Sequence, residues 1–159
     1  MLDLVLRELL ANDSVSSKTQ NEISVWGSTD KKQDLAHCVV EFCIKKLMPR
    51  MKTLAINVEL LDDMDGADGY CLCVDSRTFE IQIDSRLEGD DFITALCHEM
   101  VHVKQYARGE TKDVNQFTKA WKGEEYIAMY STVKEYMALP WEAEAYKLQE
   151  ELCEKYHLV

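Results

Sequence analysis

The sequence predicts an α+β fold, in which a short run of β-strands lies between helices. Three observations lead to this prediction. Alternating apolar residues mark strands in the middle of the chain, apolar residues at helical spacing mark helices on either side, and no long crossover separates the strands. The 159 residues, of which 47% are hydrophobic and 30% charged, suit one compact domain. We therefore expect residues 1–159 to form a single domain around a small sheet.

Two helices are expected before the central strands. The first, MLDLVLRELLAND, carries apolar residues at helical spacing and is interrupted by charges, which is typical of an amphipathic helix and not of a signal peptide. EISVWG is a candidate short strand. The second helix begins near residues 28–34, where Ser28, Thr29 or Asp30 can cap it, and Pro49 stops it.

Three strands are expected to form a small antiparallel or mixed sheet: TLAINVELL (53–61), YCLCVD (70–75) and TFEIQID (78–84). A helix follows over residues 92–107, and the aromatic-rich residues 117–139 are expected to form one or two further helices. Pro140 opens a last helix, because proline is tolerated in a first helical turn.

The composition limits the classes of partner. A net charge of −11 repels phosphate backbones and disfavours broad nucleic-acid binding. No stretch reaches the roughly 18 apolar residues of a membrane span, so no membrane association is expected. The six cysteines include no CxxC pair, which disfavours a four-thiolate zinc site. With no export signal, we expect a cytoplasmic, reducing location.

The stretch ALCHEMVHVKQYARG (95–109) holds a candidate metal site. On a helix, His98 and His102 project about 40° apart and one turn apart, which suits two bonds to one zinc ion. Glu99 is offset by about 100° from His98, so it is poorly placed as a ligand. It could instead hold a water molecule and accept its proton.

The other side of this helix carries a stripe of core residues: Ile93, Leu96, Met100, Val103 and Ala107. Between Phe92 and Val103, Glu99 is the only ionisable side chain besides the histidines and a cysteine, so the helix lacks a charged solvent face. Burying these groups is costly unless they are paired or metal-bound, which favours a metal site over a hydrogen-bonded histidine pair in a core.

A catalytic zinc usually has a third protein ligand. Gln105 and Arg108 occupy the positions where the longer metzincin pattern needs glycine and histidine. His37 and His157 are expected to be structural or exposed. The helix opened by Pro140 offers two carboxylates in PWEAEAY, Glu142 and Glu144. They flank its apolar stripe on opposite sides, so both cannot face the metal, and helical geometry alone does not choose between them.

HEMVH, followed later by PWEAEA, resembles the HExxH zincin metallopeptidases, in particular compact bacterial and phage-type members such as the SprT-like and ImmA-like groups. The resemblance covers roughly Asp34 to Glu151. It implies a minimal zincin fold, with the sheet packed on the motif helix and the last helix supplying a third ligand. In related families with an E-x-x-A-(D/N) pattern the first glutamate binds zinc. That implies Glu142 as ligand with Glu144 as second choice, although Tyr146 departs from the pattern.

The reaction that the resemblance implies is peptide hydrolysis with one zinc ion per chain, bound by His98, His102 and Glu142. Zinc would lower the pKa of a water molecule towards about 7, and Glu99 would act as general base. Oxyanion stabilisation is expected from one of three tyrosines: Tyr126, Tyr130 and Tyr136. A peptide or protein substrate could add as a strand to TFEIQID or YCLCVD.

Two other functions remain open from the sequence. One is a non-catalytic zinc-binding structural or accessory protein, for instance of a phage virion. Glu99 discriminates against it, because a purely structural site has no need for an acid there. The other is a DNA-associated peptidase of the SprT type, which is expected to carry a basic or zinc-ribbon appendage that the sequence to Val159 lacks.

Overall fold

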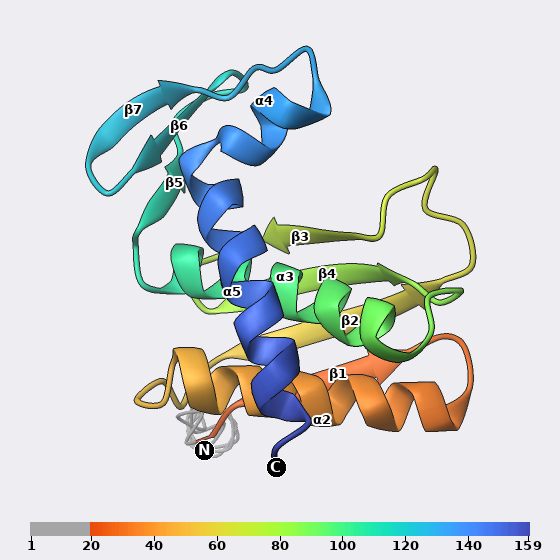
Figure 1. The fold of residues 1–159 in the computed structure, drawn as a ribbon. Coiled ribbons are helices and arrows are strands. Elements are labelled where there is room, and N and C mark those ends of the chain that lie inside the picture. The colour runs from red at the N-terminus through yellow and green to blue at the C-terminus, as the bar shows by residue number, and fades with distance from the viewer. Residues whose placement is uncertain (1–19) are drawn as a thin grey trace, which may run out of the picture.

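The structure is a computed structural model and describes residues 20–159, so the helix expected over residues 1–13 lies outside the described residues. Figure 1 shows helices gathered on one side of a sheet, with a smaller sheet beyond it. Within residues 20–159, no helix is long and apolar enough to span a membrane. The elements in chain order are β1 (Glu22–Trp26), α2 (Asp30–Leu47), β2 (Ala55–Leu61), β3 (Gly69–Cys73), β4 (Thr78–Asp84), α3 (Gly89–Ala107), β5 (Thr111–Asp113), β6 (Thr118–Trp121), β7 (Glu124–Ile127), α4 (Val133–Ala138) and α5 (Pro140–Tyr156).

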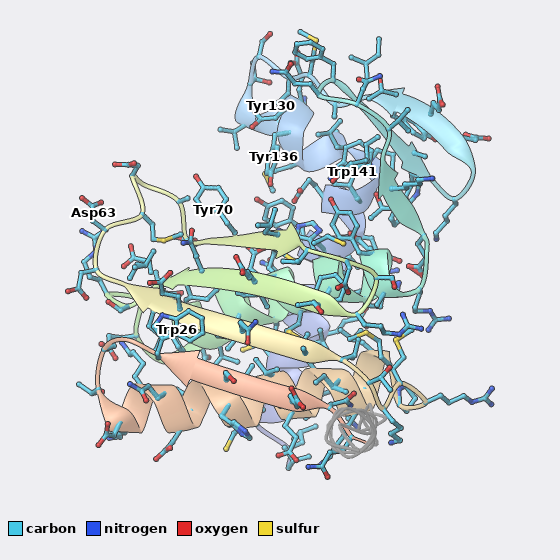
Figure 2. The ribbon with its side chains drawn as sticks, turned by 180° about the vertical axis from the view of Figure 1, so that it is seen from behind. Trp26, Asp63, Tyr70, Tyr130, Tyr136 and Trp141 are labelled. Atoms are coloured by element: carbon cyan, nitrogen blue, oxygen red, sulfur yellow. The ribbon has the colours of Figure 1, made fainter. Side chains whose placement is uncertain are left out.

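The main sheet is mixed and has the strand order β1-β2-β4-β3. β1, β2 and β4 are parallel, and β3 is antiparallel to β4. The expected number of three strands was wrong, because EISVWG pairs with β2 as a fourth. α2 provides the crossover that returns the chain in the same direction. Figure 2 shows the sheet from its other face, over which no helix of the described chain lies.

Local signals explain where the helices begin. Thr29 caps α2, its side chain accepting a hydrogen bond from the Lys32 backbone N–H at 3.3 Å. α3 begins at Gly89, earlier than expected, and takes Asp90 and Asp91 into its first turn, where the helix dipole favours negative charge. The stripe of five apolar residues expected on this helix is buried as predicted. α5 begins at Pro140 as expected.

The prediction of helices for residues 117–139 was largely wrong. β5, β6 and β7 form an antiparallel three-stranded sheet, and only the short α4 is helical in this region. Lys122 and Gly123, with φ of 47° and 87°, join β6 to β7. Two consecutive residues with positive φ give the tight turn whose twist matches a hairpin. The aromatic residues in this region therefore belong mostly to strands and loops.

Candidate metal centre

Two helices bring three metal-binding side chains together. His98 and His102 lie one turn apart on α3, and Glu142 lies in the first turn of α5, which packs against α3 and contributes Ala145 and Leu152 to the core. The Nε2 atoms of the two histidines are 3.1 Å apart. Glu142 Oε2 lies 3.1 Å from His98 Nε2, and Glu142 Oε1 lies 3.4 Å from His102 Nε2. One donor atom from each residue thus converges on a common point.

Two glutamines set the orientation of the imidazole rings. Gln149 Oε1 lies 2.8 Å from His98 Nδ1, and Gln105 Oε1 lies 2.9 Å from His102 Nδ1. An amide oxygen only accepts, so each Nδ1 donates its proton, and the neutral form of each ring presents its Nε2 lone pair to the common point. Two lone pairs and a carboxylate that face one another fit a divalent cation such as Zn²⁺, whose histidine ligands are held in this way.

The orientation of the Gln105 side chain is itself fixed. Gln105 is fully buried, and its Nε2 donates to the Trp141 carbonyl and to Glu144 Oε2, each at 2.9 Å. The amide oxygen is therefore left for His102. Because both acceptors of the Gln105 Nε2 group, the Trp141 carbonyl and Glu144, lie on α5, this side chain also links α5 to α3.

The two candidate carboxylates lie in different surroundings. Glu142 is buried against the histidines, whereas Glu144 pairs with Lys104 Nζ at 3.0 Å and accepts from Gln105. The expectation that both could not face one site is confirmed. Glu142 is the carboxylate that lies with the histidines. Glu144 instead accepts a hydrogen bond from Gln105, whose amide oxygen accepts from His102.

Burial and neighbouring charges act in opposite directions on the ionisable groups of the centre. Burial by itself would raise the pKa of the Glu142 carboxyl, but hydrogen bonds and charge interactions with His102 and His98 bring this pKa well below its ordinary value. Burial would likewise lower the pKa of His102, yet hydrogen bonding to Glu142 and the charges of Glu142 and Glu99 raise it above its ordinary value. These interactions thus favour an ionised Glu142 carboxylate that is balanced by positive charge.

Glu99 lies beside this group without belonging to it. Its side chain is buried, and burial raises its pKa, with His102 and His98 acting in the opposite direction. Gly69 of β3 comes so close that an added Cβ would lie 2.9 Å from Glu99 Oε1. Glycine at position 69 therefore leaves room for the Glu99 carboxylate between α3 and β3.

β3 is the strand next to the candidate centre and lies at the edge of the main sheet. β4 is paired on both sides, with β2 and with β3, so TFEIQID has no free edge. Of the two segments considered for strand addition, YCLCVD, which contains most of β3, is the one whose outer edge no strand of residues 20–159 pairs with. Backbone groups of an extended chain could pair with it alongside Glu99.

The three candidate tyrosines differ in position. Tyr136 is half-buried, and its pKa is raised by burial, by the charge of Glu142 and by a hydrogen bond to that carboxylate. Tyr126 donates from its hydroxyl to Glu124 at 3.0 Å. Tyr130 is exposed, with its ring centroid 4.8 Å from that of Tyr136 (Figure 2). Among the three, Tyr136 is the one whose surroundings include Glu142.

Sequence reasoning missed two residues that line the centre. The ring of Tyr146 lies 4.7 Å from that of His98, centroid to centroid, and Gln149 accepts from the same histidine. Their spacing could have revealed them, because positions 142, 146 and 149 fall on one face of a helix. His37 is exposed and His157 lies beside Asp90, so neither joins the centre, as expected.

Comparisons with known proteins found no match for this chain. The chain matches no protein-family model, no curated protein and no solved structure. The resemblance to zincins therefore rests on the sequence motifs alone and stays a prediction.

Proposed function

We propose that this protein is a zinc-dependent peptidase with a minimal zincin architecture, in which His98, His102 and Glu142 hold the metal. The observation that supports this most directly is the convergence of the two Nε2 atoms and the Glu142 carboxylate, with a second buried acid, Glu99, beside them. Two histidines and one carboxylate are the ligand set of several catalytic zinc sites, which leave one position open.

Each side chain has a distinct role in the proposed reaction. Bound zinc would supply Lewis acidity for the scissile carbonyl and for the attacking water. Glu99 takes the proton from that water and delivers it to the leaving amine nitrogen. The burial of Glu99 suits this role, because a general base works best when its pKa lies near the working pH. Tyr136 would donate a hydrogen bond to the developing oxyanion.

The substrate would lie along β3. The open edge of this strand offers backbone donors and acceptors to an extended peptide, and Gly69 brings that edge next to Glu99. Recognition through backbone groups would place a peptide bond near Glu99 without requiring particular side chains. The substrate is accordingly a peptide or protein segment in extended conformation.

The proposal is tested with Glu99→Gln, which keeps the shape of the side chain and removes its basicity. The zinc-loaded chain is incubated with a mixed peptide library, and cleavage is read by mass spectrometry. We expect the variant to retain its zinc and to cleave at least about 100-fold more slowly, the scale of a lost general base. Glu59→Gln, on the uncovered face of the main sheet, is the matched control and should cleave normally.

Two results would count against the proposal. An undiminished rate for Glu99→Gln would show that Glu99 is not the base. A zinc-loaded wild type that cleaves no library peptide would favour the non-catalytic zinc-binding protein. A variant lacking both histidines, His98→Ala with His102→Ala, controls for contaminating peptidases, because its preparation should show no cleavage.

A further inference from the structure

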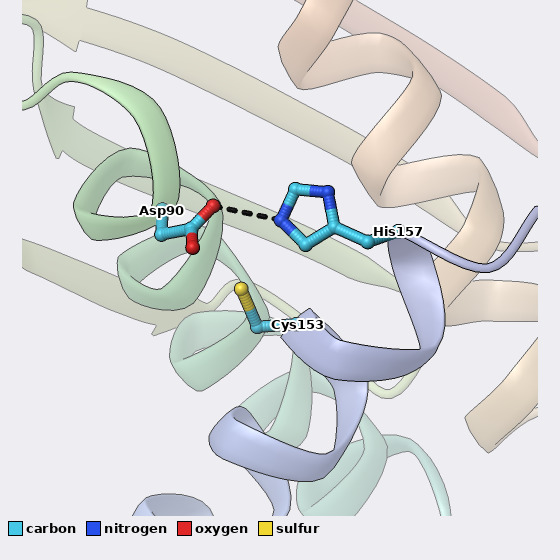
Figure 3. Close-up of side chains that lie close together, drawn as sticks. All are labelled: Asp90, Cys153 and His157. Carbon is cyan, nitrogen blue, oxygen red and sulfur yellow. Dashed lines mark hydrogen bonds and ion pairs between the residues drawn. The ribbon is translucent and has the colours of Figure 1, made fainter.

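A second cluster of metal-binding side chains lies at the opposite end of the same two helices. Asp90 is in the first turn of α3, and Cys153 and His157 are at the end of α5 (Figure 3). One potential ligand atom from each residue lies within 4.8 Å of the others. We propose that Asp90, Cys153 and His157 form a second zinc site, which joins the start of α3 to the end of α5.

The spacing of the two α5 residues suits a shared metal. Cys153 and His157 are four residues apart, so they project from one side of the helix, the same spacing that His98 and His102 have on α3. Thiolate, imidazole and carboxylate are the three ligand types that zinc takes in proteins. Their combination favours a borderline cation such as Zn²⁺ over Mg²⁺ or Ca²⁺, which prefer oxygen ligands only.

The hydrogen bond in this cluster marks the position for the cation. His157 Nε2 lies 2.7 Å from Asp90 Oδ1, so the two residues share a proton that a metal ion would replace. Figure 3 shows the other ring nitrogen on the far side of the ring from the Cys153 sulfur. Nε2 already contacts Asp90, so no ring nitrogen is left to act as a base for the Cys153 thiol. Nε2, the sulfur and the carboxylate instead lie on the same side of the imidazole ring, as a shared cation would require.

The three residues lie at the boundary between the core and the solvent. Cys153 is buried among core residues, while the side chains of His157 and Asp90 are 51% and 72% exposed. A cation could enter from solvent, and water could complete its coordination. Because α3 carries His98 and His102 and α5 carries Glu142, a metal at this position would fasten together the helices that form the candidate catalytic centre.

Cobalt distinguishes the two sites, because only the second contains sulfur. The metal-free full chain is titrated with Co²⁺, which substitutes for zinc and absorbs in the near ultraviolet when a thiolate is bound. We expect two Co²⁺ per chain with a thiolate band. His98→Ala with His102→Ala should retain one Co²⁺ and the band, and adding His157→Ala to that background should abolish both.

Cys153→Ser should lose the band and keep one Co²⁺. His157→Ala alone, a change at an exposed position that does not endanger folding, should lose the band as well. Cys38→Ser, which removes an exposed thiol on α2, is the matched control and should keep it. The proposal would be overturned by a wild type that shows no thiolate band, or by a band that survives both Cys153→Ser and His157→Ala. The cluster would then be only an exposed hydrogen bond between His157 and Asp90 next to a buried cysteine. This readout does not depend on peptidase activity, so the two proposals succeed or fail separately.

Discussion

Replacing Gln105 with methionine would test how the candidate centre is held together. The two side chains are similar in volume, so Gln105→Met opens no large cavity but removes three hydrogen bonds at 2.9 Å, to His102, to the Trp141 carbonyl and to Glu144. At about 1 kcal/mol for each bond, the free energy of unfolding of the metal-free chain should fall by about 3 kcal/mol. Zinc affinity should fall about 10- to 100-fold, because His102 loses the group that orients its ring.

The assay is urea unfolding in the presence of a chelator, followed by a competitive zinc titration. The matched control is Gln149→Met, which removes the corresponding bond to His98 at a partly exposed position where water can replace it. This control should lose only about 1 kcal/mol. The reasoning would be refuted if Gln105→Met kept wild-type stability within about 0.5 kcal/mol, or if it bound zinc as tightly as wild type.

Further substitutions, and removal of the metal, distinguish effects on stability from effects on peptide cleavage. Gly69→Ala should slow peptide cleavage while zinc content, measured by metal analysis, stays near wild type, because the added Cβ would displace Glu99. Gly27→Ala should lower stability in urea unfolding by more than about 1 kcal/mol, because φ there is +84° and an added Cβ would lie 2.3 Å from a backbone oxygen of β2. Tyr136→Phe should lower kcat in the peptide-cleavage assay by about 100-fold, and Tyr126→Phe should not. Removing zinc with a chelator should lower the midpoint of thermal unfolding, since zinc at 100 times its Kd contributes about 2.7 kcal/mol.

Elements with strong local signals were predictable from the sequence. The Thr29 cap and Pro49 bracket α2, Pro140 opens α5, and alternation marks β2 and β4. The hairpin at Lys122–Gly123 carries an equally local signal, a turn between TKAW and EEYI, but the prediction of helices for this aromatic-rich segment passed over it. Parallel pairing of β1 with β2 was not predictable from local pattern, because it depends on where α2 returns the chain.

The candidate site divides in the same way. His98, His102 and Glu99 followed from spacing on one helix, which is local geometry. The choice between Glu142 and Glu144 depends on how α5 packs against α3. Glu144 forms an ion pair with Lys104 and accepts a hydrogen bond from Gln105, which leaves Glu142 beside the histidines. These contacts join residues far apart in the chain, so no periodicity within α5 could have revealed them.

The most direct test of the central claim is the zinc content of two glutamate variants. In a Cys153→Ser background, which removes the contribution of the second site, the chain should bind one zinc ion. Glu142→Ala should lose it, while Glu144→Ala should retain it with reduced affinity, since Glu144 only holds Gln105 in place. Retention of zinc by Glu142→Ala together with its loss from Glu144→Ala, or a parent chain that binds no zinc, would contradict the assignment of His98, His102 and Glu142 as one metal centre.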